Sequence, residues 1–484
     1  MSYKVQITLE KNYKIRIKTN HDKYMKVMQD NFSFHVQNYF WMQKFKAGMW
    51  DGKVKFITDA CLMPFGLLLD FLRTHKKLFP DLKLEPDDGI KQLFKGDKID
   101  IKYDLSLSPR PYQKETIEIA LKYSKGIIRS ATASGKSLAI SYIIKNLLDN
   151  REITKIRRCL IVVPSTQLVE QFRNDMIKYG ISEQFIGKVY TGYKEWDNAI
   201  VISTWQTLKN NHDKIKMYDA VFADECHQVK AHELKKIFSK SKAKYRLGFT
   251  GTLPDHITDL YNTKAFLGPV LKEYPSGLLA EQGFIAKCNV KAFNIEYPLG
   301  TEANDYKNIK DEVFNDRFRL KFIGKLINKL DDNSLLLVNY IAEGDKLVKL
   351  LNRRTKKEVV FLSGKDKTKI REEWRQKMMD QKNIALIATY GIFQQGINIP
   401  NLKYAMLASP TKSKIRTLQS IGRTLRTSDN KKDGAVIFDI IDNVKFLGKH
   451  GKKRLEYYES EGFNVDLIDL QETLLAKAIA VSLA

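Results

Sequence analysis

The chain has 484 residues, and its 82 lysines and arginines against 56 acidic residues give a formal net charge of +26. Hydrophobic residues make up 43%, which excludes a disordered chain, and the length accommodates about two to four domains. The positive surplus indicates a polyanionic partner, nucleic acid ahead of an acidic membrane surface, and the 22 tyrosines, 25 phenylalanines and 5 tryptophans are available for stacking on bases.

Residues 1–95 are predicted to form a small α+β accessory domain, with DNA binding as a candidate role. Apolar and polar residues alternate over 4–9 and 13–17, which predicts two strands joined by a hairpin. The apolar run at 67–73 predicts a helix. The segment 84–98, rich in Asp and Lys, is predicted to be a linker.

A second hairpin is predicted around Asp51-Gly52, because this dipeptide precedes an alternating run. Trp50 and Lys53 lie in this hairpin and are candidate nucleic-acid contacts, since tryptophan stacks on bases and lysine binds phosphates. A small aromatic core with a solvated lysine face is the alternative interpretation.

Strands and helices alternate from residue 96 to about 285, which is typical of an α/β domain with a parallel sheet. Within it, a strand at 126–129, a loop of small residues at 130–137 and a helical run at 138–148 form the setting of a phosphate-binding loop. Lys136 is expected to bind the β and γ phosphates of ATP, and Ser137 to bind Mg²⁺. The other candidate nucleotide contacts in this loop are Ala133, Ser134 and Gly135.

The loop departs from the usual pattern, because Ser130 replaces the first glycine and Ala133 stands where glycine is common. An ordinary strand-to-helix turn with an exposed lysine is therefore the alternative. Upstream, Gln113 can pair with an adenine edge and Tyr112 can stack on the ring, although this short pattern is a weak signal.

Two strands of this domain end in threonines, with Thr166 after 159–164 and Thr204 at the end of 200–204. Both are candidate contacts to nucleic-acid phosphates, and the alternative is that they only cap the following helices. Another apolar strand ends in Asp224 and Glu225. Asp224 is expected to hold the Mg²⁺ together with Ser137, and Glu225 to orient and deprotonate the attacking water.

The second half, 286–445, is predicted to contain another sheet of the same kind, with strands near 335–340, 359–364 and 383–389. Thr389 is a third candidate contact to a nucleic-acid strand. Arg423 and Arg426 are spaced i and i+3, which places them on one helix face. They are expected to act as arginine fingers on the γ phosphate, and a surface ion-pair helix is the alternative.

The motifs 130–137, 224–227 and 250–252, in this order, resemble motifs I, II and III of superfamily 2 helicases and translocases, and 110–113 resembles their adenine-reading glutamine motif. The segments 383–400 and 419–426 resemble motifs V and VI. The resemblance covers about 100 to 445 and implies two RecA-like domains, ATP and Mg²⁺. It also makes Gly396 of motif V a nucleotide contact. Asn398 stands where many relatives have Asp, so no carboxylate role is transferred to it.

The N-terminal segments 48–52 and 63–67, together with 413–415 before motif VI, resemble the UvsW recombination helicases of T4-type phages. This resemblance implies a DNA helicase that acts on branched DNA in fork regression, branch migration and R-loop unwinding. Its expected partners are branched, duplex and single-stranded DNA and RNA–DNA hybrids, bound by a monomer. Residues 446–484 are expected to form a basic C-terminal tail.

The four cysteines are far apart, so neither a disulfide framework nor a zinc site is expected. The sequence shows no signal-peptide core and no apolar run of about 18 residues, which predicts a cytoplasmic protein, in the host cytoplasm if a phage encodes it. Three alternatives remain: an RNA helicase or duplex translocase of the same superfamily, a non-catalytic nucleic-acid-binding protein, and a P-loop enzyme that phosphorylates a small molecule.

Overall fold

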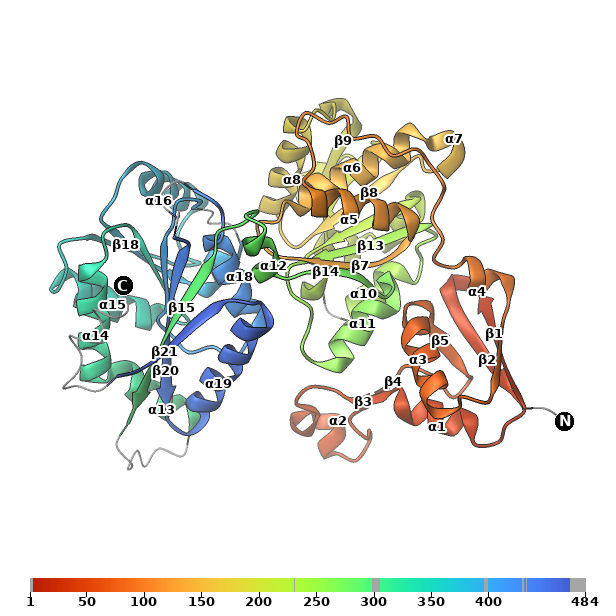
Figure 1. The fold of residues 1–484 in the computed structure, drawn as a ribbon, viewed down its shortest axis with the longest axis horizontal. Coiled ribbons are helices and arrows are strands. Elements are labelled where there is room, and N and C mark those ends of the chain that lie inside the picture. The colour runs from red at the N-terminus through yellow and green to blue at the C-terminus, as the bar shows by residue number, and fades with distance from the viewer. Residues whose placement is uncertain are drawn as a thin grey trace. The chain divides into compact units, whose positions relative to one another are not determined.

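The computed structural model of the chain describes residues 3–229, 231–297, 305–395, 399–428, 431 and 433–470. The fold divides into two compact units, the first made of Met1–Ser130 and Gly135–Glu273 and the second of Ala131–Ser134 and Tyr274–Ala484. Each unit is built around a mainly parallel sheet (Figure 1), and in the first unit the edge strand β10 pairs antiparallel with β9. The fold class predicted from the sequence, tandem RecA-like α/β domains after a small α+β domain, is confirmed.

The small N-terminal domain has a mixed sheet with the strand order β5-β2-β1-β6. The alternation of β1 and β2 puts Val5, Ile7, Ile15 and Ile17 on the buried face, as the period of two requires. Its elements are β1 (Lys4–Glu10), β2 (Lys14–Thr19), α1 (Tyr24–Asn31), β3 (Ser33–His35), α2 (Gln43–Lys46), β4 (Lys53–Lys55), β5 (Leu62–Pro64), α3 (Leu68–Leu78), β6 (Lys83–Pro86) and α4 (Asp88–Gln92). The predicted hairpin of β1 and β2 and the predicted helix α3 are confirmed.

The tight hairpin predicted at Asp51-Gly52 is wrong. β4 pairs with β3, so a long loop of residues 36–52 connects the two strands. Gly52 has φ +79, and a Cβ atom there would lie 2.3 Å from the ring of Tyr39. The dipeptide therefore closes the base of the long loop, where the aromatic ring requires glycine, and does not form a two-residue turn.

The linker predicted at 84–98 is also wrong over most of its length. β6 pairs in parallel with β1, and Asp87 caps α4 by accepting a hydrogen bond from Ile90 N (2.7 Å). Ile90 and Leu93 are buried in the core of the small domain. Apolar residues spaced among the charged ones were the signal for this extra strand and helix.

The first RecA-like sheet has the strand order β10-β9-β11-β8-β12-β13-β7-β14 among the described residues. The strands are β7 (Lys125–Ser130), β8 (Cys159–Val163), β9 (Ile186–Tyr190), β10 (Tyr193–Lys194), β11 (Ile200–Thr204), β12 (Ala220–Asp224), β13 (Tyr245–Thr250) and β14 (Val270–Tyr274). The helices are α5 (Pro111–Lys122), α6 (Lys136–Asp149), α7 (Arg151–Thr154), α8 (Thr166–Lys178), α9 (Trp205–Asn210), α10 (Ala231–Phe238) and α11 (Ile257–Leu267). α5, α6 and α8 lie on one side of the sheet, and α10 and α11 lie on the other (Figure 1).

The small domain packs against the first sheet within the same unit. The ring of Tyr261, on α11, joins the core of the small domain, and the Lys264 ammonium pairs with the Asp70 carboxylate at 2.9 Å. The ring of Tyr13 lies 4.3 Å from the guanidinium carbon of Arg246 and 4.9 Å from the ammonium of Lys125. Two buried cations of neighbouring strands thus face one aromatic ring.

The second sheet has the order β17-β18-β16-β19-β20-β15-β21 among the described residues, and its neighbours all pair in parallel. The strands are β15 (Cys288–Glu296), β16 (Ser334–Val338), β17 (Glu358–Leu362), β18 (Ile384–Thr389), β19 (Tyr404–Leu407), β20 (Ala435–Asn443) and β21 (Asn464–Leu470). The helices are α12 (Ser276–Glu281), α13 (Tyr306–Asn315), α14 (Arg317–Lys329), α15 (Ile341–Asn352), α16 (Thr368–Asp380), α17 (Tyr390–Gln395), α18 (Lys414–Thr424) and α19 (Lys445–Ser460).

The basic tail predicted after residue 445 is wrong up to residue 470. α19 packs on β20, burying Leu447, Tyr457 and Tyr458, and β21 pairs with β15 along its length. Its lysines face outward while its apolar residues face the sheet, so the charge reflects one face of an integral helix. The rest of the predicted tail, residues 471–484, lies outside the described residues. No helix in the described part of the chain is long and apolar enough to cross a bilayer.

Candidate active site

The phosphate-binding loop connects β7 to α6, at the carboxyl edge of the first sheet. Gly135 caps α6 with φ +74, a left-handed conformation that glycine adopts without strain. Ala133 has φ +69. A left-handed alanine costs about 1–2 kcal/mol, so the sequence departure at Ala133 keeps the loop shape at the expense of backbone strain. Strain of this kind is common where backbone must approach a ligand.

Lys136 extends from the first turn of α6 over the end of β7. Its ammonium donates to the Ser130 carbonyl at 3.3 Å and lies 3.6 Å from Glu225 Oε1. The two side chains are 11% and 15% exposed, so solvent screens this pair less than a surface pair. The structure thus brings together the predicted phosphate-binding lysine and the predicted base.

Glu225 follows β12 in a left-handed conformation with φ +47. This backbone turn directs its side chain toward β13, where Oε2 accepts hydrogen bonds from Thr250 Oγ1 and Gly251 N, both at 3.5 Å. β12 and β13 are adjacent and parallel, so their carboxyl ends meet at one edge. The contacts place motifs II and III in one polar cluster.

His227 connects the two motifs a second time. Its Nδ1 lies 2.5 Å from Thr250 Oγ1 and 3.4 Å from Glu225 Oε2, and Thr250 Oγ1 also donates to the Thr252 carbonyl at 2.8 Å. Burial lowers the pKa of His227, which favours the neutral imidazole. A neutral His227 ring contacts both Glu225 and Thr250, so a movement of the Glu225 side chain can shift the Thr250–Thr252 turn without a new charge in the site.

Asp224 fits the predicted magnesium-binding role. Its Oδ1 is buried and has no hydrogen-bond partner among the described residues. Burial, and next the negative charge of Glu225, raise the pKa of Asp224, as expected where no cation neutralises the carboxylate. Mg²⁺ is usually held by one or two protein oxygens and the substrate phosphates, so Asp224 and the Ser137 hydroxyl form a suitable protein donor set.

The residues predicted to read adenine lie at the start of α5. Gln113 accepts from Arg110 N (2.8 Å) and donates to the Gly135 carbonyl (3.3 Å), so its amide connects this turn to the phosphate loop. Tyr112 is only 5% exposed. Because the first turn of α5 packs into the domain, little of the Tyr112 ring is open in this structure, and its stacking on adenine stays a prediction.

Tyr179 is a site residue that the sequence did not reveal. It ends α8, and its hydroxyl lies 3.1 Å from the hydroxyl of Ser137. Its carbonyl accepts a hydrogen bond from Ser106 N, which fixes the end of the helix. A tyrosine about forty residues away in sequence carries no motif signal, and only the packing of α8 beside α6 brings it to Ser137, the serine predicted to bind Mg²⁺.

The three threonines predicted to bind a nucleic-acid strand occupy similar positions but different environments. Thr166 is exposed in the first turn of α8, where Ser165 provides the cap. Thr204 is 4% exposed and caps α9 through Thr207 N, which favours the capping alternative for this residue. Thr389 is half-buried at the end of β18. Thr166 and Thr389 remain candidates for phosphate contact.

The loop 36–52 of the small domain and the adjoining start of β4 carry the remaining nucleic-acid candidates. Trp50 is half-buried and donates from Nε1 to the Lys53 carbonyl at 2.8 Å, and Lys53 is exposed. Trp41 is 69% exposed and Met49 80% exposed. An aromatic core would bury these side chains, so the exposure favours a contact surface over the core alternative.

Motif VI differs from the predicted helix. α18 ends at Thr424, so Arg426 lies beyond it, and the expectation that Arg423 and Arg426 share a helix face is wrong. The Lys431 ammonium explains the ending, because it donates to the carbonyls of Thr424 (2.7 Å) and Arg426 (2.9 Å). Both arginines are half-buried. Gly396 and Asn398 of motif V lie outside the described residues.

Three family models match successive parts of the chain. The model described as DNA helicase UvsW, N-terminal, matches residues 4–79, the type III restriction enzyme, res subunit, matches 106–255, and the helicase conserved C-terminal domain matches 319–428. The first match covers the loop with Trp50, the second covers Lys136, Asp224 and Glu225, and the third covers Arg423.

Individual relatives align over most of the chain. An ATP-dependent DNA helicase, uvsW, of Enterobacteria phage T4 is 27% identical over 90% of this chain and 94% of its own length. A DNA 3′-5′ translocase, XPB2, of Sulfurisphaera tokodaii is 22% identical over 78% of this chain and 91% of its own. Among solved structures, S. cerevisiae Dbp5 bound to RNA and ADP BeF₃ has a TM-score of 0.53 at 15% identity, covering 78% of this chain and 93% of its own; this likeness supports the fold alone.

Proposed function

We propose that this chain, an ATP-hydrolysing DNA helicase that resembles superfamily 2 and the UvsW helicases of T4-type phages, uses ATP to remodel branched DNA. The observation that carries the proposal is the cluster of Lys136, Glu225, His227 and Thr250 at one sheet edge, in a chain whose N-terminal segment matches the UvsW model. The reactions proposed are branch migration, fork regression and R-loop unwinding.

The residues divide the hydrolytic step among them. Lys136 binds the β and γ phosphates, the α6 amino end adds its favourable dipole, and Glu225 takes a proton from the attacking water. Asp224 and Ser137 hold Mg²⁺, which when bound neutralises charge on the phosphates. Arg423 and Arg426 stabilise the charge of the transition state. Because Lys136 and Glu225 contact each other here, a phosphate that binds Lys136 changes the surroundings of the base.

Hydrolysis is coupled to DNA through motif III and the strand contacts. Thr250 bonds to Glu225 and His227, so movement of the 250–252 turn changes the position of the base. Thr166 and Thr389 grip the phosphates of one strand. Repeated changes in this grip would move the protein along DNA in the host cytoplasm, with an affinity that falls as salt rises.

Recognition of branched DNA is assigned to the small domain. The exposed Trp41 and Met49 and the partly exposed Trp50 lie near Lys44 and Lys46 in the loop 36–52 and near Lys53, the first residue of β4. Apolar and aromatic side chains stack on bases unpaired at a junction, while lysines hold the backbone. A linear duplex offers phosphates but few open base faces, so the loop should favour junctions over linear DNA.

The test is ATP-dependent conversion of a fluorescent four-way junction into forked products. The parent protein should convert the junction, Lys136→Ala should fail, and Trp41→Ala should convert it at least about fivefold more slowly with little change in hydrolysis stimulated by single-stranded DNA. A parent that hydrolyses ATP on DNA but leaves the junction intact while displacing a strand from a linear duplex would contradict the proposal. That outcome would favour a helicase that acts on linear duplexes.

A further inference from the structure

Four neighbouring strands of the second sheet end at the same edge, and the segments that follow them begin there. β16, β19, β20 and β15 are adjacent and parallel, so the residues after each strand lie at the same carboxyl edge. These residues include Tyr340 after β16, Lys412 after β19 and Phe446 after β20. The carboxyl edge of a parallel sheet is where α/β domains bind ligands.

Aromatic side chains are exposed along this edge. Tyr306 at the start of α13 is 40% exposed, Tyr340 is 60% exposed and Phe446 on α19 is 36% exposed. The Tyr306 ring lies 6.2 Å from Phe446 and 5.8 Å from His450, both centroid distances. Large aromatic side chains usually bury their rings, so a group left open to solvent indicates a surface that contacts something.

Packing beneath the rings holds them in place. Ile309 and Val313 of α13 pack on Leu447 of α19. The Lys310 ammonium lies 3.6 Å from the centre of the Tyr340 ring and 2.7 Å from the Glu343 carboxylate. Tyr306 and Lys310 are one helical turn apart, so α13 supports both Tyr340 and Phe446.

The charge around the rings is positive. Lys412, Lys445 and Lys449 are exposed, and the Lys445 ammonium lies 5.5 Å from the Phe446 ring. The Glu343 carboxylate below is buried, paired with Lys310, and accepts from Tyr340 N (3.0 Å) and Ser409 Oγ (2.7 Å). Burial, followed by the cations Lys412 and Arg454, lowers the pKa of His450. An anion placed here would therefore meet lysines while Glu343 is neutralised by Lys310, and Asp305, the exposed acid before Tyr306, caps α13 by accepting from Lys307 N at 3.1 Å.

We propose that Tyr306, Tyr340 and Phe446 with Lys412, Lys445 and Lys449 form an aromatic platform that binds single-stranded DNA. Bases stack on the rings and the lysines hold the backbone, the combination that single-strand-binding proteins use. The platform deepens the proposed function and rests on it. It adds a second strand-binding surface to Thr389. Both lie at the carboxyl edge of the second sheet, where β18 also ends.

The aromatic part is tested with the double variant Tyr306→Ala, Phe446→Ala in the full chain, using a fluorescent oligothymidylate. Removing the stacking of a single base should weaken binding about fivefold or more, because stacking contributes about 1–3 kcal/mol per base. The DNA concentration for half-maximal stimulation of hydrolysis should rise by a similar factor while the rate at saturating DNA changes little. Leu467→Ala, which removes another exposed apolar side chain, is the matched control.

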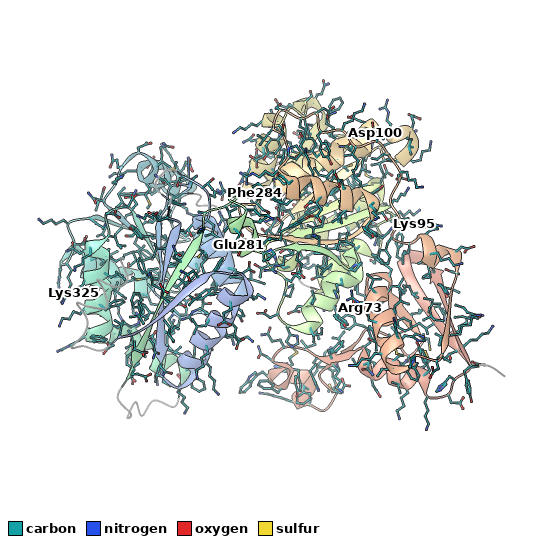
Figure 2. All side chains as sticks on the ribbon, viewed as in Figure 1. Arg73, Lys95, Asp100, Glu281, Phe284 and Lys325 are labelled. Atoms are coloured by element: carbon teal, nitrogen blue, oxygen red, sulfur yellow. The ribbon has the colours of Figure 1, made fainter. Side chains whose placement is uncertain are left out.

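The charge is tested by salt dependence. Lys412→Ala with Lys449→Ala should flatten the plot of log affinity against log salt by about 0.7 for each DNA phosphate that the variant no longer binds. Lys325→Ala is the control, because Lys325 lies on α14, across the second sheet from α19 (Figure 2). Conservative changes Tyr306→Phe and Phe446→Tyr should keep binding, which separates stacking from folding.

A photocrosslink checks the surface without any substitution: a bromodeoxyuridine oligonucleotide should label the parent at α13 or at the start of α19. The platform would be overturned if the aromatic variant bound oligothymidylate within about twofold of the parent and the lysine variant kept the parent's salt slope. It would also be overturned if the aromatic variant lost affinity for oligouridylate but kept its affinity for oligothymidylate. If DNA fails to stimulate the parent at all, the proposed function itself fails; if DNA stimulates parent and variant alike, only the platform fails.

Discussion

Glu225 Oε1 lies 3.6 Å from Lys136 Nζ, so the predicted general base and the predicted phosphate ligand form an ion pair. The other oxygen of the carboxylate meets Thr250 and Gly251. One carboxylate therefore touches motif I and motif III together. We expect a phosphate that binds Lys136 to break the ion pair with Glu225, which leaves the carboxylate free to bind the attacking water. Substrate binding would in this way activate the base.

Glu225→Gln should bind ATP but hydrolyse it at least about a hundredfold more slowly, because the amide cannot accept the proton and general bases contribute about 10²- to 10⁴-fold. Steady-state hydrolysis and binding of a fluorescent ATP analogue measure the two effects separately. Turnover within tenfold of the parent would show that Glu225 is not the base.

Thr250→Val should reduce the DNA-stimulated rate about tenfold with little change in ATP affinity. The substitution removes the hydroxyl that lies 2.5 Å from His227 Nδ1 and donates to the Thr252 carbonyl. Thr250→Ser keeps the hydroxyl and serves as the control. A rate that falls in Thr250→Ser but not in Thr250→Val would mean that the methyl group, not the hydrogen bonds, matters at this position.

Tyr179→Phe should raise the Mg²⁺ concentration needed for half-maximal hydrolysis about two- to fivefold. Its hydroxyl lies 3.1 Å from that of Ser137 and orients it, so its loss leaves the serine free to rotate. Tyr142→Phe is a matched control, because the Tyr142 hydroxyl donates to the Leu107 carbonyl and lies on the same helix as Ser137. A magnesium titration that does not distinguish the two variants would refute the role of Tyr179.

Lys125 predicts a pH dependence of stability. Burial, and next the cations Arg246 and Lys244, lower the pKa of Lys125 to about 7, below its ordinary 10.5. The unfolded chain therefore binds more protons between pH 7 and 10.5, and the free energy of unfolding rises with pH in that window. One titrating group contributes up to about 1.4 kcal/mol per pH unit.

Urea unfolding at pH 7 and pH 9 measures this effect against Lys125→Met. The parent should gain roughly 2 kcal/mol relative to the variant over this interval, since the variant has no proton to lose. The same pH dependence in both proteins would place the titrating group elsewhere. Hydrogen bonds from Lys125 to the Leu93 carbonyl and Ser124 Oγ contribute to the free energy of unfolding at both pH values, so their loss in the variant does not create the difference between pH 7 and pH 9.

The resemblance read from the motifs is confirmed, and so are most strands near them, because buried parallel strands are continuous apolar runs that end in polar ligands. The sequence was less informative where packing decides the structure. Asp51-Gly52 has the composition of a tight turn, yet the ring of Tyr39 assigns Gly52 to the base of a longer loop. Only contacts distant in sequence reveal such a difference.

Two further departures have the same origin. α18 stops before Arg426 because Lys431 binds the carbonyls at its end, and the lysine-rich run after 445 is one face of a helix whose other face covers β20. Likewise, Tyr179 reaches Ser137 through the packing of two helices. Periodicity predicts a helix, but its end and its neighbours depend on residues that no local pattern identifies.

The most direct test of the account is ATP hydrolysis by the full chain with no nucleic acid, single-stranded DNA, duplex DNA, a four-way junction and RNA, beside Lys136→Ala. The account predicts that DNA stimulates hydrolysis, most strongly in branched form, and that Lys136→Ala is inactive throughout. Stimulation by RNA alone, or hydrolysis that no nucleic acid changes, would contradict it.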